Sequence, residues 1–302
     1  MRSRLRWDEW HDPDPVVFSE LIGACDRSFG HVPIEVTAEE LAGFMQPGAA
    51  IRLIRGSETV GAATAIPDDV ALVGVPRSLA ERDRVLAEVM SWFAGRLGVG
   101  ALWLPDGDEA AELVAANAGF VLQYTDIQMT LPVTPVQAPG APPPGYETVT
   151  LGTDRASGLD AVHDLVCRTW SVAPHRAAFE GRFAALTADP SLWVLLRSSS
   201  GPSTGRLAAA AWGSIQASGS TRVGQVGHLN VDPGHRRRGL GPWTLAELVR
   251  RFEVADPRVS MAQLGVHGNN ASYAPALYSR LGWTEVSRHQ KWARRHERAT
   301  DP

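Results

Sequence analysis

The stretch VDPGHRRRGLG (residues 231–241) lies between an alternating apolar segment, VGQVGHLNV (223–231), and a segment of helical apolar period that begins at Pro242. This pattern predicts a strand, a glycine-rich turn and a helix. Such a turn presents free backbone N–H groups and the positive end of the helix dipole, and its glycines let a ligand approach the main chain closely. Its three arginines add positive charge. The stretch therefore predicts a site for a phosphate or pyrophosphate, although its spacing matches neither a Walker loop nor the dinucleotide fingerprint.

The elements around this turn follow the order β, α, α, β, β, β, α, β, α, β. A proline-rich segment, PVTPVQAPGAPPPG (132–145), cannot hold a helix or a central strand, and it divides the chain almost in half. The first half repeats the order of the second. We therefore predict a first domain at 1–132, a linker at 133–145 and a second domain at 146–302. In the second half we expect strands at 146–151, 191–198, 205–215, 223–231, 261–267 and 284–293 and helices at 159–170, 177–187, 242–254 and 272–281; in the first, helices at 16–29, 38–44, 79–96 and 108–117 and strands at 51–56, 59–66, 70–75, 101–105 and 120–131.

Single residues support the repeat. Cys25 aligns with Cys167, and Arg55 with Arg197, at the same offset of 142 residues. A Gly-aromatic pair at 119–120 recurs at 282–283, an offset of 163 residues. A duplicated fold explains these matches, and two unrelated α/β domains are the alternative.

Composition excludes several classes of protein. The chain has 302 residues, 44% of them hydrophobic and 21% charged, which is typical of a globular protein with a sizeable core. Of its 29 basic residues only Lys291 is a lysine, which indicates a compositional bias toward arginine, and the net charge of −4 argues against a nucleic-acid partner. No apolar run is long enough for a membrane span, and no apolar segment follows the N-terminal arginines, so we expect a cytoplasmic protein without a membrane partner. Cys25 and Cys167 are too few for a disulfide framework or a metal cage.

From Tyr146 to Arg295 the sequence resembles the GCN5-related N-acetyltransferase (GNAT) superfamily. The family pattern, a strand ending Leu-x-Val-x-Pro followed by Gln/Arg-x-x-Gly-x-Gly/Ala, appears here in full. About thirty residues later come the family's strand, Asn, Leu-Tyr and Gly-Phe-like positions. These motifs stand as Leu229 to Pro233, as Arg236, Arg237, Arg238, Gly239, Leu240 and Gly241, and as Leu264 to Val266, Asn269-Asn270, Leu277-Tyr278 and Gly282-Trp283.

The resemblance implies an α/β (α+β) fold of two tandem GNAT domains, each a mixed, mainly antiparallel sheet flanked by helices. It also implies acetyl-CoA or another acyl-CoA as cofactor. In that pattern the segment Arg236–Gly241 binds the pyrophosphate, and the backbone of Leu229 and Val231 pairs with the pantetheine arm. Asn270, or its neighbour Asn269, matches the family's Asn near the cofactor.

The same resemblance makes Tyr278 the acid that protonates the leaving thiolate, and a phenol of pKa ~10 suits this role. Packing in the core through its ring is the alternative. Many family members have a glutamate as base where this chain has Gln225, which does not accept a proton at neutral pH. His228 is a candidate base, although by strand alternation it faces away from Gln225 unless a bulge intervenes. His267 and His175 are further candidates, and deprotonation through water is another.

The first half lacks the matching groups. It has Gly74 to Ala80 (GVPRSLA) at the place of the turn, followed by the acidic Glu81 and Asp83, and Ala115 at the position of Tyr278. Acidic groups at a helix start repel a pyrophosphate. We therefore expect a degenerate first domain and an active second one.

These observations predict an acyl-CoA-dependent N-acetyltransferase that acts on the amine of a small molecule or peptide by direct attack, since no cysteine lies in the motifs to hold the acyl group. A catalytically inactive acyl-CoA-binding or sensing protein is one alternative. An acyltransferase with a hydroxyl or thiol acceptor is another.

Overall fold

The chain divides into two compact units in a computed structural model, which describes residues 5–31, 50–55, 57–66, 70–79, 81–96, 100–133, 139–150, 155–170, 189–218, 221–268 and 274–294. Unit 1 comprises Met1–Met129, Val266–Arg280 and Thr284–Pro302. Unit 2 comprises Thr130–Gly265 and Leu281–Trp283. The domain boundaries at 132 and 146 stay a prediction. The two units are defined by contacts in space, and residues 266–280 and 284–302 of the second half belong to unit 1.

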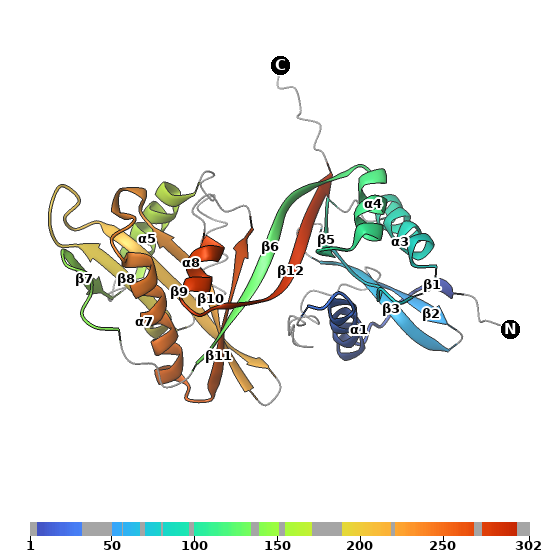
Figure 1. The fold of residues 1–302 in the computed structure, drawn as a ribbon, viewed down its shortest axis with the longest axis horizontal. Helices are drawn as coiled ribbons and strands as arrows, with labels where there is room; N and C mark the ends of the chain where they lie inside the picture. The colour runs from blue at the N-terminus through green and yellow to red at the C-terminus, as the bar shows by residue number, and fades with distance from the viewer. Residues whose placement is uncertain are drawn as a thin grey trace, which may run out of the picture. The chain divides into compact units, whose positions relative to one another are not determined.

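Unit 1 contains a mixed sheet with helices on both of its faces (Figure 1). Its strands lie side by side in the order β1-β2-β3-β4-β5-β12-β6, and β4 pairs with β5 in parallel. The strands are β1 (Leu5–Glu9), β2 (Ala50–Arg55), β3 (Glu58–Ile66), β4 (Val70–Gly74), β5 (Ala101–Pro105), β12 (Thr284–Arg294) and β6 (Phe120–Pro132), and the helices are α1 (Pro15–Ser28), α3 (Arg82–Arg96) and α4 (Glu109–Asn117).

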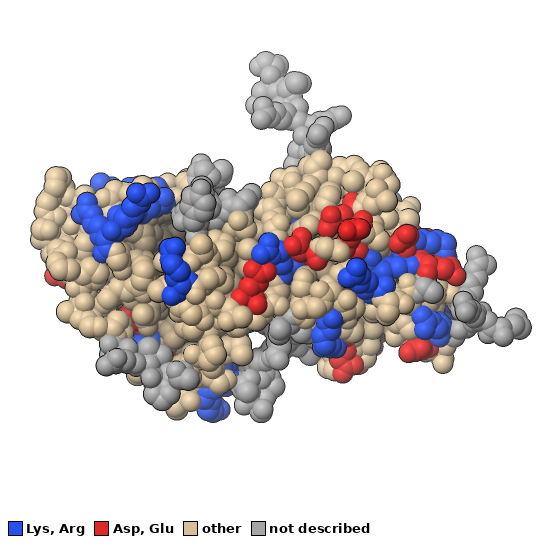
Figure 2. All heavy atoms as spheres, in the orientation of Figure 1, with Lys and Arg blue, Asp and Glu red and all other residues tan. Residues whose placement is uncertain are grey.

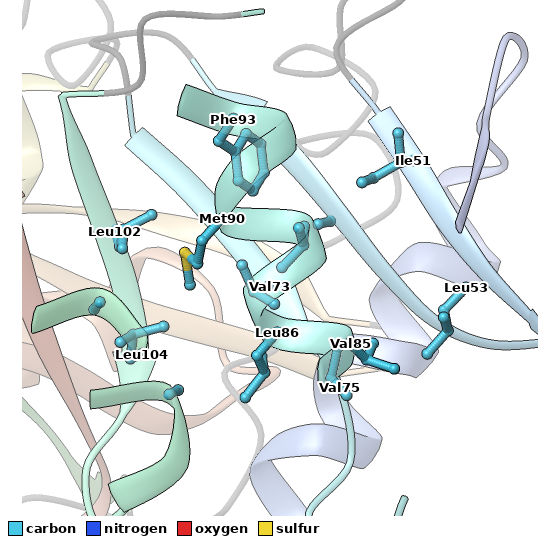
Figure 3. Packing of buried hydrophobic residues seen from close by; sticks show 14 of the residues in the cluster. Ile51, Leu53, Val73, Val75, Val85, Leu86, Met90, Phe93, Leu102 and Leu104 are labelled. Atoms are coloured by element: carbon cyan, nitrogen blue, oxygen red, sulfur yellow. The ribbon is translucent and has the colours of Figure 1, made fainter. Parts of the chain in front are cut away.

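Strand alternation assigns the two faces of this sheet. Ala50 and Ala62 belong to the cluster that holds Phe18 of α1. Their neighbours in sequence, Ile51 and Ala63, belong to the larger cluster formed with α3 and α4. Figure 3 shows this larger cluster, in which α3 directs its apolar side chains onto the strands. The apolar side of α3 thus packs against every second residue of the strands.

The last strand of the chain lies in unit 1, beside the first half's own strands. β12 pairs with β5 antiparallel, from His289 opposite Pro105 to Ala293 opposite Ala101. The sequence predicted a strand here, but its alternation does not encode which strand it joins. β6 and β11 (Val259–His267) each have residues in both units.

Unit 2 has strands in the order β11-β10-β9-β8-β7, in which β10 and β11 are parallel and the other pairs antiparallel. Val162 and Leu165 of α5 pack with Trp212 on one face. On the other face Phe252 of α7 lies so close to the strands that a Cβ at Gly213 or Gly224 would collide with its ring. The elements are β7 (Tyr146–Val149), α5 (Arg155–Thr169), η1 (Pro190–Leu192), β8 (Trp193–Ser198), β9 (Leu207–Ser218), β10 (Thr221–Val231), η2 (Pro233–His235) and α7 (Leu240–Ala255), and α8 (Ala274–Arg280) belongs by its contacts to unit 1.

Most of the expected elements form where the hydrophobic period predicts them. The expected helices at 38–44 and 177–187 lie outside the described residues. β1 was not predicted, because only Leu5 and Trp7 alternate with polar residues in LRWDE, which is a short signal for a strand; it pairs with β2 from Leu5 opposite Arg55 to Glu9 opposite Ile51. Among the residues described, no helix combines the length and the apolar character needed to cross a membrane.

Candidate functional site

The turn between β10 and α7 has the backbone form of an anion-binding site. Gly239, the N-cap of α7, has φ +79°, and Arg237 has φ +61°, so two residues of the turn lie in the left-handed region. Glycine adopts this region without a Cβ clash, whereas for arginine it is strained. No side chain caps the helix start, and its first turn contains no acidic residue. The first amides of α7 therefore remain available to an external acceptor.

The three arginines of the turn are exposed, and two of them are oriented by the protein. Arg236 Nε donates to the carbonyl of Val231 over 3.2 Å. Arg238 donates to the hydroxyl of Tyr146 over 3.2 Å, and that hydroxyl lies 2.9 Å from Nδ1 of His235. Figure 2 shows basic side chains gathered on one part of the face of unit 2, whereas acidic and basic side chains are mixed on unit 1. The charge and the geometry fit a pyrophosphate.

Asp232, an acidic residue next to the turn, is paired with groups other than the three arginines of the turn. The Asp232 carboxylate accepts from Arg168 Nε over 2.6 Å and from the amide of Gly234 over 2.9 Å. Partial burial raises its pKa, but these hydrogen bonds outweigh the burial and hold the pKa of Asp232 below its ordinary value. Asp232 is thus ionised and paired, and it shapes the turn from the side of α5.

The strand that leads into the turn separates from its parallel neighbour. β10 pairs with β11 from Arg222 to Val226, and over the described length of both strands no pairing extends further, although β10 continues to Val231. On its other edge β10 stays paired with β9, with Leu229 opposite Ala211. The edge of β10 beyond Val226 therefore presents main-chain groups to a ligand, as the role expected of Leu229 and Val231 requires.

A bulge lies at the point where the two strands separate. Val226 is opposite Gly213, but His228 is opposite Trp212, so Gly227 is an extra residue in β10. The extra residue reverses the alternation, and His228 therefore faces the same side as Gln225, the side covered by α5. Strand alternation alone predicts that the two side chains lie on opposite faces unless a bulge intervenes. The structure has such a bulge, so the two side chains share a face.

His228 continues a row of aromatic rings on this face. Trp193 of β8 stacks on Trp212 of β9 with ring centroids 5.0 Å apart. Trp212 in turn lies 4.8 Å from the ring of His228, and Trp170 after α5 lies 5.4 Å from it. Trp193 and Trp212 are buried, but His228 is half-buried and Trp170 is 40% exposed. The exposed end of the row is thus formed by Trp170 and His228, and it is the part that solvent can reach.

A buried amide holds Trp170 in place. Asn230, only 3% exposed, accepts from Trp170 Nε1 over 2.9 Å and from Thr169 Oγ1 over 3.1 Å through the same side-chain oxygen. Because Asn230 lies on β10, these bonds fix the end of α5 to the strand that carries His228. The sequence analysis did not single out Asn230, since an asparagine in a strand has no distinguishing pattern.

Tyr278 lies in α8 with 8% of its surface exposed. Burial raises the pKa of its phenol to about 12, so the hydroxyl keeps its proton throughout the neutral range. Asn269, Asn270 and His175 lie outside the described residues.

A group of polar residues on β6 was missed by the sequence analysis. Tyr124 stacks on His267 with centroids 4.0 Å apart, and Gln128 donates to Asp126 over 2.6 Å. Burial raises the pKa of Asp126, although Gln128 and the nearby His267 act in the other direction. The alternation of Tyr124, Asp126 and Gln128 along the strand was the available signal. All four residues belong to unit 1.

The matching place in the first half is filled by the protein's own charges. Arg82, the first residue of α3, forms a buried two-pronged ion pair with Asp108, and its Nε donates to the carbonyl of Val75 over 3.1 Å. The residue before it, Glu81, has φ +61° where the second half has Gly239. A cavity of about 630 Å³ lies here, lined by Arg77 and by several acidic side chains. Mixed charges and an occupied arginine make a poor pyrophosphate site.

Comparison with known proteins agrees with this geometry. Residues 159–283 match the model of the acetyltransferase (GNAT) family, so the resemblance inferred from the sequence motifs is confirmed. No protein of curated function matches the sequence.

Solved structures share the fold over nearly the whole chain. A GCN5-related N-acetyltransferase from Sphaerobacter thermophilus has a TM-score of 0.74 at 17% identity, covering 95% of this chain and 94% of that one. A tandem GNAT protein from the clavulanic acid biosynthesis pathway has a TM-score of 0.62 at 17% identity, with 96% and 98% covered. A GNAT-family acetyltransferase from Colwellia psychrerythraea has a TM-score of 0.59 at 12% identity, with 97% and 100% covered. The predicted fold class is confirmed.

Proposed function

We propose, from the premise that residues 159–283 form a domain of the acetyltransferase (GNAT) family, that this chain transfers an acyl group, most simply acetyl, from acyl-CoA to the amine of a small molecule or peptide. The observation that carries the proposal is the uncapped start of α7, where Arg237 and Gly239 both have left-handed backbone conformations. A paired set of such residues before a helix directs several amides toward one anion.

The chain's own residues suit the binding of CoA. The amides from Arg237 to Gly241 bind its pyrophosphate, and the guanidinium groups of Arg236 and Arg238 add charge. The free edge of β10 at Leu229 and Val231 pairs with the pantetheine arm. When bound, the thioester supplies an activated acyl carbon.

The transfer is a direct attack. The amine nitrogen forms a bond to the acyl carbon, the carbon–sulfur bond breaks, the amine gives up a proton, and the thiolate receives one. Tyr278 is the proposed proton donor, since burial keeps its phenol neutral. His228 is the proposed proton acceptor, directly or through a water oriented by Gln225, because the bulge brings both side chains to one face of β10.

Gln225 in place of a glutamate favours a second candidate, an inactive protein that binds or senses acyl-CoA. The two candidates differ in one measurement, the release of free CoA thiol from acetyl-CoA by the purified full-length chain, screened over a library of amines. Amine-dependent release supports the transferase. Tight acetyl-CoA binding without release for any amine, alcohol or thiol contradicts it and favours the sensor, whereas release with alcohols or thiols alone identifies the other class of acceptor.

A further inference from the structure

A cluster of metal-ligating side chains lies in unit 1, in a part of the chain that the proposed function does not use. Asp26 lies in the last turn of α1, His31 follows the end of that helix, and His289 lies in the middle of β12. One ligand atom from each residue lies within 4.8 Å of the other two. The first and last parts of the sequence thus meet in a group of two imidazoles and one carboxylate.

Two residues of the group are buried, and His31 is half-buried. Asp26 is 2% and His289 8% exposed, and Nε2 of His289 lies 3.0 Å from Oδ1 of Asp26. The amide of His31 donates to the carbonyl of Asp26 over 3.0 Å, which fixes the chain as it leaves the helix. The rings of His31 and His289 lie edge to face with centroids 5.7 Å apart. All three side chains therefore point into one small volume.

A hydrogen-bonded histidine–aspartate pair alone does not account for His31. Its Nδ1 is buried and has no hydrogen-bond partner among the residues that the structure describes, which is costly for a polar atom inside a protein. A neutral imidazole with an unpartnered buried nitrogen is in the state that a metal ion requires of a ligand.

We propose that Asp26, His31 and His289 bind a divalent transition-metal ion, with Zn²⁺ as the reference ion. Imidazole nitrogen and carboxylate oxygen are ligands that Zn²⁺ binds at about 2.0–2.2 Å, which places neighbouring ligand atoms ~3.3 Å apart. Nε2 of His289 and Oδ1 of Asp26 lie 3.0 Å apart, close to this spacing, and a ring nitrogen of His31 lies within 4.8 Å of the ligand atoms of both residues. The bound ion joins β12 to α1 within unit 1 and stabilises the folded state.

The first test is a titration of the tag-free, full-length protein, stripped of metal, with Co²⁺ and Zn²⁺. The proposal expects one equivalent of Co²⁺ with visible d–d absorption and without a sulfur-to-cobalt charge-transfer band, and a thermal midpoint that rises when Zn²⁺ is added. His31→Gln is expected to weaken Zn²⁺ binding by about 100-fold or more and to abolish the rise in midpoint.

His163→Gln is the matched control, because His163 belongs to a separate thiol–imidazole pair in unit 2, with Nε2 3.6 Å from Sγ of Cys167. It is expected to bind Zn²⁺ as the unchanged protein does. Equal affinity in His31→Gln and the unchanged protein overturns the proposal, as does a charge-transfer band that disappears in Cys167→Ala. If His31→Gln does not fold, the cobalt spectrum of the unchanged chain decides alone: nitrogen and oxygen ligation supports the site, and sulfur ligation or no uptake refutes it.

Discussion

Gly239 and Gly241 stand two residues apart in the turn, yet they serve different physical needs. Gly239 has φ +79°, with nothing within 4 Å of an added Cβ, so its backbone conformation and not space requires glycine. Gly241 lies in the first turn of α7, and an added Cβ there would meet only Val231 Cγ2 at 3.7 Å, an ordinary contact. The fold itself therefore requires glycine at position 239 and not at position 241.

Gly239→Ala is expected to lower the free energy of unfolding by about 1–2 kcal/mol, because a Cβ is unfavourable in the left-handed region. Gly241→Ala is expected to raise it by about 0.5–1 kcal/mol, because alanine is the better helix former. Urea unfolding of both variants checks this. A Gly239→Ala variant as stable as the native chain contradicts the assigned conformation. A separate calorimetric titration with CoA measures the loss of binding that is expected when the turn is distorted.

Tyr278→Phe is expected to lower turnover by about tenfold or more while leaving CoA affinity within a factor of about two, since only the proton donor is removed. Steady-state kinetics with the best amine of the screen measure both values. The melting temperature of the variant serves as the control for folding. Unchanged turnover refutes the role of Tyr278 as acid.

Asp126 predicts a pH effect of defined sign. Its pKa in the folded protein lies above the ordinary value of 3.8, so its contribution to stability is present at acid pH and is lost as the pH rises through the folded pKa. Asp126→Asn is therefore expected to raise the melting temperature by about 1–3 °C at pH 7. The difference from the native chain is expected to vanish well below pH 3.8. A variant that is less stable at pH 7 contradicts the prediction.

At the scale of elements, α7 packs closely on the sheet because the Phe252 ring lies over two glycines, which have no side chains. Phe252 occupies the space above Gly213 and Gly224, on the face opposite His228. The helix that presents the phosphate-binding amides can therefore approach β9 and β10 closely. Its position depends on three residues outside the turn, Gly213, Gly224 and Phe252.

Gly224→Ala is expected to cost about 1–3 kcal/mol of stability, because the new methyl group collides with Phe252 and displaces α7. In the Phe252→Ala background, which lacks the colliding ring atoms Cγ, Cδ2 and Cε2, Gly224→Ala is expected to cost less than in the native chain. Urea unfolding of the two single variants and the double variant gives the interaction energy. Strictly additive effects contradict the contact.

Elements with strong periodicity were predictable from the sequence, and local exceptions were not. The turn before α7 was predicted, since two glycines and three arginines between a strand and a helix have few other uses. The bulge at Gly227 was not, because an extra residue becomes visible only in the register with β9. Asp126 and His31 were missed because each also has a neighbour far away in sequence, His267 for Asp126 and His289 for His31, which no local pattern reveals.

At the scale of the whole molecule, the partner of the last strand could not be read from alternation, which is the same for every possible neighbour. Strand β12 completes unit 1 beside β5, although it follows the elements of the second half in sequence.

Removal of β12 is therefore expected to unfold unit 1. A chain ending at residue 283 leaves the edge of β5 without its partner and is expected to lose the cooperative unfolding transition of unit 1 and to aggregate. A chain ending at residue 294 retains β12 and serves as the matched control. Calorimetry and size-exclusion chromatography compare the two. An intact, monomeric chain of 283 residues contradicts the assigned pairing.

The pairing of β5 with β12 also delays the completion of unit 1 during translation. About 180 residues separate Pro105 from Thr284, so at ~5–20 residues per second the ribosome needs roughly 9–36 s to deliver the partner of β5. During that interval the nascent first half exposes a strand edge on which other chains can pair. Chaperone binding to the nascent chain is therefore expected to persist until β12 has been synthesised, and a stop codon ahead of β12 damages a unit whose other strands were made much earlier.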